Sequence, residues 1–287
     1  MAPAVATEPE RDARAAAEPW QLSLYRRSIK KKETMRAIFG LLPDVVGKRC
    51  LEVGCGTGTS SWLLRRRGGE WVSTDFEAEQ VESARQLVGD DVQLIGTDAL
   101  PFPDASFDVV VGINFLEHLT HDVEFVQHMT RVLKPGGYFL LTCPEGVPGR
   151  LGYRIKQVYG FTSDSGGFGH VRDGYSRQEL ERLMSRVGLR TERIDSYSRL
   201  FTELVENSLN FLYHRAAAKR QKLGTAGQFH GETAPATGED LKTVGWKFRA
   251  YQGLYPLLRG FSLLDRLIPF SEGYMFCVRA RKPLAGA

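Results

Sequence analysis

A glycine-rich loop, Glu52-Val53-Gly54-Cys55-Gly56-Thr57-Gly58, is the segment of this 287-residue chain whose residue types and spacing most clearly indicate chemistry. It lies between a segment at 48–53 that is predicted to be a buried strand and a helical pattern at 59–67. Glycine lets the backbone turn sharply and approach a ligand closely. The start of the following helix offers free N–H groups and a positive dipole end. The loop therefore suits the polar tail of a nucleotide-like cofactor.

A dinucleotide site is one alternative for this loop. The NAD fingerprint is GxGxxG, and its third glycine, counted from Gly54, would fall at Thr59. A pyrophosphate has no obvious use for Glu52 at the strand end, whereas an ammonium-bearing ligand could use that carboxylate directly or through water. An NAD-dependent dehydrogenase is therefore the least favoured function.

An acidic residue, Asp75, closes the second predicted strand. It lies 21 residues after Gly54, the distance that one strand–helix–strand unit needs. Two vicinal hydroxyls are two donors, and one carboxylate can accept from both. Asp75 is therefore a candidate for binding the hydroxyls of a ribose.

The elements that must position these residues alternate regularly between strands and helices. Strands are predicted at 48–53, 71–74, 92–95, 107–113, 138–143, 191–197 and 274–281, and helices at 19–42, 59–67, 77–88, 123–133 and 177–187. The run at 107–113 is apolar almost throughout, as a parallel strand covered on both faces should be. This alternation predicts a doubly wound parallel α/β sheet.

With these motifs in this order, the chain resembles the class I S-adenosylmethionine-dependent methyltransferase family over about 47–144, and more weakly to 193. The glycine loop resembles the motif that holds the amino-acid part of the cofactor. Asp75 resembles the acidic residue that binds the ribose, and Phe76 lies where the family often packs a side chain against adenine. Gly96-Thr97-Asp98-Ala99 resembles the adenine motif, in which Asp98 would accept from the exocyclic amine. The sequences at 103–108 and 132–137 resemble those before the fourth and fifth strands.

The resemblance implies a Rossmann-like sheet that is mostly parallel with an antiparallel last strand, and a helical insertion before that strand. It also implies S-adenosylmethionine as cofactor, with S-adenosylhomocysteine as product. The residues that it places around the cofactor are Glu52, Gly54, Cys55, Gly56, Gly58, Asp75, Phe76, Asp98, Ala99 and Asn114.

Three residues are candidates for the chemistry. Methyl transfer is an in-line displacement from an activated sulfonium, so a base is needed only if the acceptor must lose a proton. His118 follows the fourth strand and could be that base, because the ordinary pKa of histidine suits neutral pH. The alternative is that Glu117-His118 starts a helix and stabilises the loop. His170 and Tyr175 lie where the family often has residues near the acceptor, although packing, with Ser176 and Glu179 in a helix-capping box, is an alternative.

A metal site is a further alternative. A few O-methyltransferases of the family bind a divalent ion with Glu and His, and helical spacing would pair Glu117 with His121, and His118 with Asp122. Asp122 is better explained as the N-cap of the helix that follows. We therefore predict no metal.

The chain divides into five predicted parts: a disordered tail at 1–18, a helical cap at 19–46, the cofactor-binding core at 47–197, a mostly helical insertion at 198–273, and the last strand and tail at 274–287. The insertion carries many apolar residues and a basic run at 215–222. Core packing is the commonest role for such a segment. The other possible roles of the insertion are a lid over a hydrophobic or lipid-linked acceptor, a dimer contact and contact with a membrane surface.

Composition excludes several classes. The net charge of +4 is too weak to imply nucleic acid by itself, and we expect no nucleic-acid partner. The four cysteines form no CxxC pair, which favours a reducing, cytoplasmic setting. No apolar run is long enough for a transmembrane helix.

The function expected from the sequence is methyl transfer from S-adenosylmethionine to a small-molecule acceptor, hydrophobic, lipid-linked or anionic. The alternatives are an RNA or protein methyltransferase and a non-catalytic cofactor-binding assembly module. Asn114-Phe115-Leu116-Glu117 stands where a (D/N)PPY motif would follow the fourth strand. This argues against the common nucleic-acid and protein-glutamine N-methyltransferases.

Overall fold

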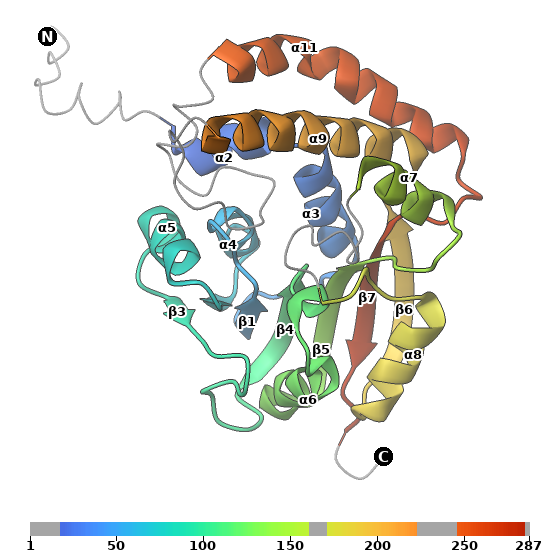
Figure 1. The fold of residues 1–287 in the computed structure, drawn as a ribbon. Coiled ribbons are helices and arrows are strands. Elements are labelled where there is room, and N and C mark those ends of the chain that lie inside the picture. Colours follow the sequence, from blue (N-terminus) through green and yellow to red (C-terminus); the bar gives the residue numbers. More distant parts are fainter. Residues whose placement is uncertain (1–17, 161–170, 223–245, 285–287) are drawn as a thin grey trace, which may run out of the picture.

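A computed structural model describes the backbone of residues 18–160, 171–222 and 246–284, with side chains for 18–160, 171–212 and 250–284. Its centre is a seven-stranded sheet in the order β3-β2-β1-β4-β5-β7-β6 (Figure 1). The strands are β1 Arg49–Val53, β2 Glu70–Asp75, β3 Val92–Leu94, β4 Phe107–Ile113, β5 Leu133–Pro144, β6 Arg190–Tyr197 and β7 Met275–Arg281. Only β7 is antiparallel to its neighbours, β5 and β6. The predicted doubly wound sheet with an antiparallel last strand is confirmed.

The helices follow the predicted alternation in the core. They are α2 Trp20–Arg27, α3 Ile29–Leu41, α4 Thr59–Arg65, α5 Ala78–Val88, α6 Asp122–Val132, α7 Leu151–Tyr159, α8 Arg177–Arg186, α9 Leu200–Lys222 and α11 Trp246–Ser262, with short 3-10 turns η1 Leu116–His118 and η3 Leu263–Leu267. No helix among the described residues combines the length and the apolar character needed to cross a bilayer.

Three local predictions need correction. The predicted helix at 19–42 is two helices, because Ser28 is extended and its hydroxyl caps the second by accepting from the Lys31 N–H. Asp122 is the first residue of α6, not its N-cap, and its carboxylate accepts from the adjacent Val123 N–H. The sequence at 134–137 lies inside β5 as an irregularity between two paired stretches, rather than before the strand. The Ser176–Glu179 capping box is confirmed.

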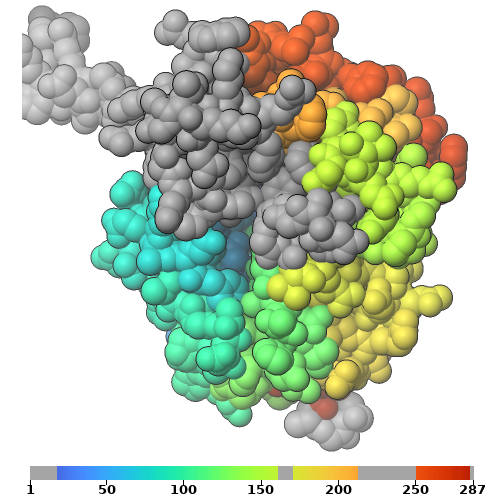
Figure 2. Space-filling view, in the orientation of Figure 1, coloured from blue at the N-terminus to red at the C-terminus, as the bar shows by residue number. Residues whose placement is uncertain are grey.

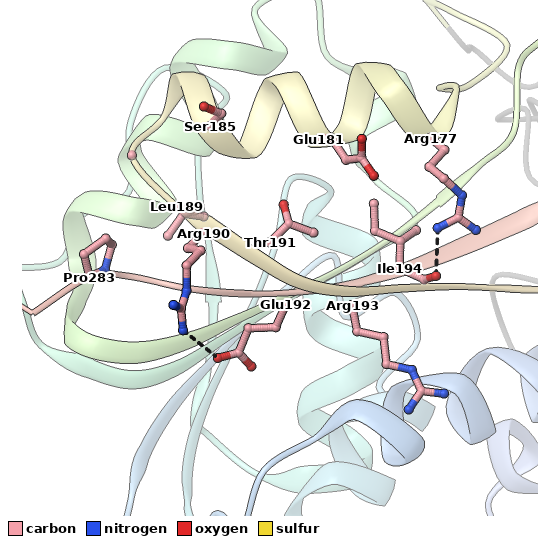
Figure 3. Close-up of a pocket in the computed structure, with 11 residues that line it drawn as sticks. Arg177, Glu181, Ser185, Leu189, Arg190, Thr191, Glu192, Arg193, Ile194 and Pro283 are labelled. Atoms are coloured by element: carbon pink, nitrogen blue, oxygen red, sulfur yellow. Dashed lines mark hydrogen bonds and ion pairs between the residues drawn. The ribbon is translucent and has the colours of Figure 1, made fainter.

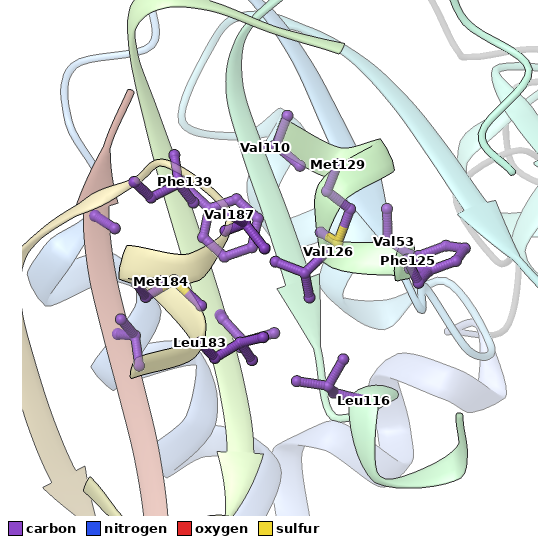
Figure 4. Close-up of a cluster of buried hydrophobic side chains, with 14 of the residues drawn as sticks. Val53, Val110, Leu116, Phe125, Val126, Met129, Phe139, Leu183, Met184 and Val187 are labelled. Carbon is purple, nitrogen blue, oxygen red and sulfur yellow. The ribbon is translucent and has the colours of Figure 1, made fainter. Parts of the chain in front are cut away.

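Two apolar layers hold the sheet between helices. On one face, α6 and α8 pack against the inward side chains of β1, β4, β5 and β7. Figure 4 shows Phe125, Val126 and Met129 of α6 beside Leu183, Met184 and Val187 of α8 over this face. On the other face, α3 packs Met35, Ile38 and Leu41 against the opposite side chains of the same strands. Both faces of the central strands are therefore buried, as their continuous apolar runs predict.

The described parts of the segment at 198–273, namely 198–222 and 246–273, are mostly helical. Its helices α9 and α11 cross above the edge where the parallel strands end, with α7 beside them (Figure 1). The next residues form β7, which completes the sheet. The five-part division itself stays a prediction, and 1–17 of the predicted tail and the stretch near 224–238 lie outside the described residues.

The buried carboxylate of Asp265 links two elements of this segment, η3 and α9. Asp265, in η3, accepts from the backbone N–H groups of Arg199, Phe201 and Thr202 at the start of α9, at 3.0, 2.8 and 3.2 Å. These are groups that a helix cannot satisfy internally. One carboxylate thus caps α9 and ties η3 to it.

We expect Asp265→Ala to lower the free energy of unfolding by about 2 kcal/mol or more, because charge-assisted bonds to buried donors are lost. Urea unfolding followed by circular dichroism measures this. The matched control is Asp104→Ala, which removes an exposed ion pair with Arg131 and should cost less than about 1 kcal/mol. Equal losses in the two variants would contradict the capping role.

Candidate functional site

The carboxyl ends of β1, β2 and β4 meet at one edge of the sheet. β1 lies between β2 and β4, and the chain reaches them on opposite sides of β1, so the direction of winding reverses there. In open α/β sheets a ligand crevice forms outside the strand ends at this reversal. The glycine loop that follows β1 lies at that point.

Two glycines of the loop are required by close packing. Gly54 has a φ of +81°, and a Cβ there would lie 2.8 Å from the Ile113 carbonyl oxygen. Gly58 has a φ of +88°, and a Cβ there would lie 2.7 Å from the Cα of Ala84. The N–H groups of Gly54 and Cys55 both donate to the Thr74 carbonyl, at 2.9 and 3.0 Å. The loop is thus pressed between β2, α5 and the end of β4.

Close packing does not explain why a glycine stands at position 56. Its φ is +51°, and a Cβ there would meet no atom of the described residues within 4 Å. Its N–H donates to Asp75 Oδ2 at 2.8 Å. The loop therefore presents an open side at Gly56, where a ligand can approach the backbone.

Asp75 closes β2 as predicted and is nearly buried. Besides the Gly56 bond, its Oδ1 accepts from the Glu77 N–H at 3.1 Å. Burial raises the pKa of Asp75, while these backbone hydrogen bonds lower it. The protein thus fixes the orientation of this carboxylate against the loop.

Glu52 lies fully buried beneath the loop. Its Oε2 accepts from the hydroxyls of Ser61 on α4 and Ser73 on β2, at 2.5 and 2.7 Å. Its Oε1 has no hydrogen-bond partner among the described residues. Burial raises the pKa of Glu52. One carboxylate oxygen of Glu52 therefore links α4 to β2, and the other makes no hydrogen bond with the described residues.

Asn114 follows β4 with a φ of +47°, which is uncommon for a residue other than glycine. Its N–H donates to the Thr142 carbonyl, and its Oδ1 accepts from the Thr142 hydroxyl at 2.8 Å. Strain of this kind persists where neighbouring contacts fix the backbone. Here β5 holds the turn after β4.

The remaining predicted cofactor residues lie around the same edge. The ring centroid of Phe76 lies 5.9 Å from that of Phe115 and 5.4 Å from that of Phe125. Asp98 and Ala99 follow β3 and are exposed. The structure brings Glu52, the glycines and Asp75 into one set of contacts, whereas no contact joins Asp98 to that set among the described residues.

The three candidates for the chemistry differ. His118 lies in η1, immediately beyond β4, and is exposed. Tyr175 is buried, donates its hydroxyl to Asp122 Oδ2 at 2.7 Å, and has the Arg172 guanidinium 3.7 Å from its ring centroid. Burial and Asp122 raise the pKa of Tyr175. These contacts show packing for Tyr175, and its role toward an acceptor stays a prediction. His170 lies outside the described residues.

Sequence reasoning missed the polar residues that surround this edge. Ser61 and Ser73 hold Glu52, Thr142 holds Asn114, and Lys156 of α7 is buried near the strand ends. A serine in the first turn of a helix over a buried strand is a weak signal that could have found Ser61. Lys156 gives no local signal, because its environment comes from distant segments.

A depression in the surface lies elsewhere. It is an open hollow of about 680 Å³ between α8 and β6, at the opposite end of the sheet from β3 (Figure 3). Arg177 donates to the Ile194 carbonyl and Arg190 pairs with Glu192 there. None of the predicted site residues lines it, so it is not the crevice of the glycine loop.

Comparison with known proteins agrees with the loop geometry. A family profile described as a methyltransferase domain matches residues 51–141. The chain is 36% identical over 131 residues to demethylmenaquinone methyltransferase of Clavibacter sepedonicus, covering 44% of this chain and 51% of that protein. It is 37% identical over 106 residues to fatty-acid O-methyltransferase of Mycolicibacterium smegmatis, covering 34% and 38%. The chain thus spans about half or less of the length of these relatives.

Among solved structures, the fold is similar to a SAM-dependent methyltransferase of Thermotoga maritima, a possible histamine N-methyltransferase. The TM-score is 0.52 at 18% identity, over 87% of this chain and 88% of the other. At this identity the likeness concerns the fold alone. The similarity to methyltransferase sequences is concentrated on 51–141, the part that holds the glycine loop, Asp75 and Asn114.

We expect Gly58→Ala to lower the free energy of unfolding by about 3 kcal/mol or more, because left-handed strain adds to a collision with the Ala84 backbone. The control is Gly188→Ala, at a φ of +76° with open space around the Cβ position, which should cost about 1–2 kcal/mol. Chemical denaturation compares the two. Similar losses would show that the contact with α5 is not tight.

Proposed function

We propose that this chain, which belongs to the class I S-adenosylmethionine-dependent methyltransferase family, transfers a methyl group from S-adenosylmethionine to a small-molecule acceptor. The observation that carries the proposal is the open side of the loop at Gly56, joined to the oriented carboxylate of Asp75. A backbone that a ligand can approach and an acidic group at the end of the next strand are what the amino-acid and ribose parts of this cofactor need.

The bound cofactor supplies an activated methyl group, so the chain's task is mainly to bind and orient. We assign Gly54, Cys55, Gly56 and Gly58, with the free Oε1 of Glu52, to the amino-acid part. Asp75 is assigned to the ribose. The residues proposed for the adenine side are Phe76, Asp98 and Ala99. Asn114 is assigned to the methyl-donor side, because it ends β4 at the same edge.

His118 is the proposed general base for an acceptor that must lose a proton, since it is exposed immediately beyond β4. Tyr175 is proposed to act through packing beneath η1, because its hydroxyl is held by Asp122. No cluster of three or more potential metal ligands occurs among the described His, Cys, Asp and Glu residues, and no step proposed here uses a metal.

A hydrophobic or lipid-linked acceptor is favoured by the outer surface of the insertion. Large apolar side chains of α11, η3 and the segment after them are exposed: Leu254, Leu257, Phe261, Leu264, Leu267 and Phe270. In Figure 2 the orange-red segment that contains α11 lies along the upper right edge of the molecule. The relatives named for menaquinone and fatty-acid methylation act on substrates of this apolar kind.

The charges of this surface favour a membrane over a second copy of the chain. Between 250 and 271 the only acidic residue is Asp265, which is buried, while Arg266 is exposed. The neighbouring acidic residues Glu272 and Glu33 are paired with arginines, and an apolar face beside an exposed arginine suits the surface of an anionic bilayer. We propose that this face makes peripheral contact with the membrane that holds the acceptor.

Asp75→Ala should weaken binding of S-adenosylhomocysteine about ten- to a hundredfold, because a charge-assisted bond is lost. Titration calorimetry measures this, with NAD as a control ligand and Asp104→Ala as a control variant. Undiminished affinity in folded Asp75→Ala would refute the assigned role. A wild-type protein that binds neither S-adenosylmethionine nor S-adenosylhomocysteine would refute the function.

Replacing Leu257, Phe261 and Phe270 together by serine should abolish flotation with vesicles of phosphatidylglycerol and phosphatidylcholine, because the apolar area that enters the lipid is removed. A matched control replaces Val46 and Leu94, exposed apolar residues outside the segment at 198–273, by serine. Absence of wild-type flotation, together with a dimer in sedimentation that the triple variant lacks, would assign the face to self-association instead.

A further inference from the structure

Lys156 is a buried lysine whose ammonium lacks a hydrogen-bond partner. It lies on α7 with 7% of its surface exposed, and its Nζ is unbonded among the described residues. It pairs with no described carboxylate within 4.0 Å and lies 4.7 Å from the ring centroid of Tyr274. Burying an unpartnered charged group costs substantial free energy, so this position needs an explanation.

Tyr274, whose ring lies beside Lys156, also carries an unsatisfied hydrogen-bond donor. Tyr274 is 3% exposed, and its hydroxyl also has no partner among the described residues. Gly152, one helical turn before Lys156, lets α7 approach this ring, since a Cβ there would lie 2.5 Å from Cδ2 of Tyr274. Two unsatisfied donors, an ammonium and a hydroxyl, are therefore packed together by the fold.

A second cation shares the ring. Lys30 Nζ lies 5.1 Å from the centroid of Tyr274 and is paired with Glu203 Oε1 at 3.4 Å. Glu203 already accepts from Ser198 and Asn207. Burial, and after it the repulsion from Lys30, lowers the pKa of Lys156 to about 8. The nearby carboxylates of Glu203, Asp173 and Glu117 favour the charged form of Lys156, but none of them forms a hydrogen bond with its ammonium among the described residues.

The cluster lies at the edge where the proposed cofactor crevice opens. Tyr274 precedes β7, and its carbonyl accepts from the Glu145 N–H just beyond β5. From the side of β4, Glu117 of η1 faces the same region, with an Oε2 that has no partner among the described residues. Burial raises the pKa of Glu117, while His118, Lys156 and Lys30 lower it.

We propose that Lys156 and the Tyr274 hydroxyl bind an oxyanion of the methyl acceptor, a carboxylate or a phosphate, with Lys30 adding positive charge. An oxyanion accepts from both unsatisfied donors at once and neutralises the ammonium of Lys156. A neutral acceptor would leave both donors unsatisfied. The proposal rests on the proposed function, and it makes the acceptor an acid whose apolar part extends away from this cluster.

The test uses the full chain saturated with S-adenosylhomocysteine and three probes: octanoate, octyl phosphate and 1-octanol. Titration calorimetry should show that wild type binds at least one anionic probe about tenfold or more tightly than the alcohol. The better of the two anions identifies the oxyanion as carboxylate or phosphate. Equal affinity for all three probes, or binding of none, would overturn the proposal.

Lys156→Met keeps the apolar stem and removes the charge. We expect it to lose about ten- to a hundredfold in affinity for the anionic probe and little for 1-octanol, while S-adenosylhomocysteine binds as in wild type. Tyr274→Phe should lose less affinity for the anionic probe. It is the alternative test variant if Lys156→Met does not fold. The control is Lys48→Met. Lys48 lies before β1 with its ammonium 6.0 Å from the Tyr138 ring centroid, and its replacement should leave the affinity for every probe unchanged.

An undiminished preference for the anion in folded Lys156→Met, or no loss of that preference at all in Tyr274→Phe, would contradict the site. A wild-type protein that does not bind S-adenosylhomocysteine is a different result, because it would refute the proposed function as well as this assignment. The two failures are thus distinguishable in one set of titrations.

Discussion

The Thr74 carbonyl and the Asp75 carboxylate at the end of β2 hold the glycine loop that follows β1. They accept from the N–H groups of Gly54, Cys55 and Gly56, and Gly58 lies against Ala84 of α5. This arrangement leaves the side of the loop at Gly56 open among the described residues. The crevice, the start of α4 and the direction of the Asp75 carboxylate all depend on that fit, so the cofactor assignment rests on backbone geometry more than on any single side chain.

Buried charge is concentrated at the carboxyl edge of the sheet. Glu52 lies beneath the loop, Glu117 follows β4, and Lys156 faces Tyr274, with the partly buried Lys30 on the same ring. At the amino edge, by contrast, Lys134 pairs with a partly exposed Asp108. Groups kept out of water without full compensation are costly, and they are commonly retained where a ligand completes their bonding. One edge of the sheet therefore serves cofactor and acceptor together.

The sequence was sufficient for the sheet because its signals are local. Apolar runs, the helix-ending glycines and the spacing from Gly54 to Asp75 predict β1, β2 and β4 without knowledge of distant contacts. The break at Ser28 was missed because a single capping serine interrupts an otherwise continuous helical pattern. The Lys156–Tyr274 contact could not be predicted, because 118 residues separate its members and β7 brings them together only by returning beside β5.

The most direct test of the account is hydrogen–deuterium exchange of the full chain with and without S-adenosylhomocysteine. The account predicts slower exchange in the loop at 54–60, at 75–78 after β2 and at 114–118 after β4, with no change in the hollow between α8 and β6. Protection confined to that hollow, or no protection at ligand concentrations that saturate related enzymes, would contradict a cofactor site built on the glycine loop.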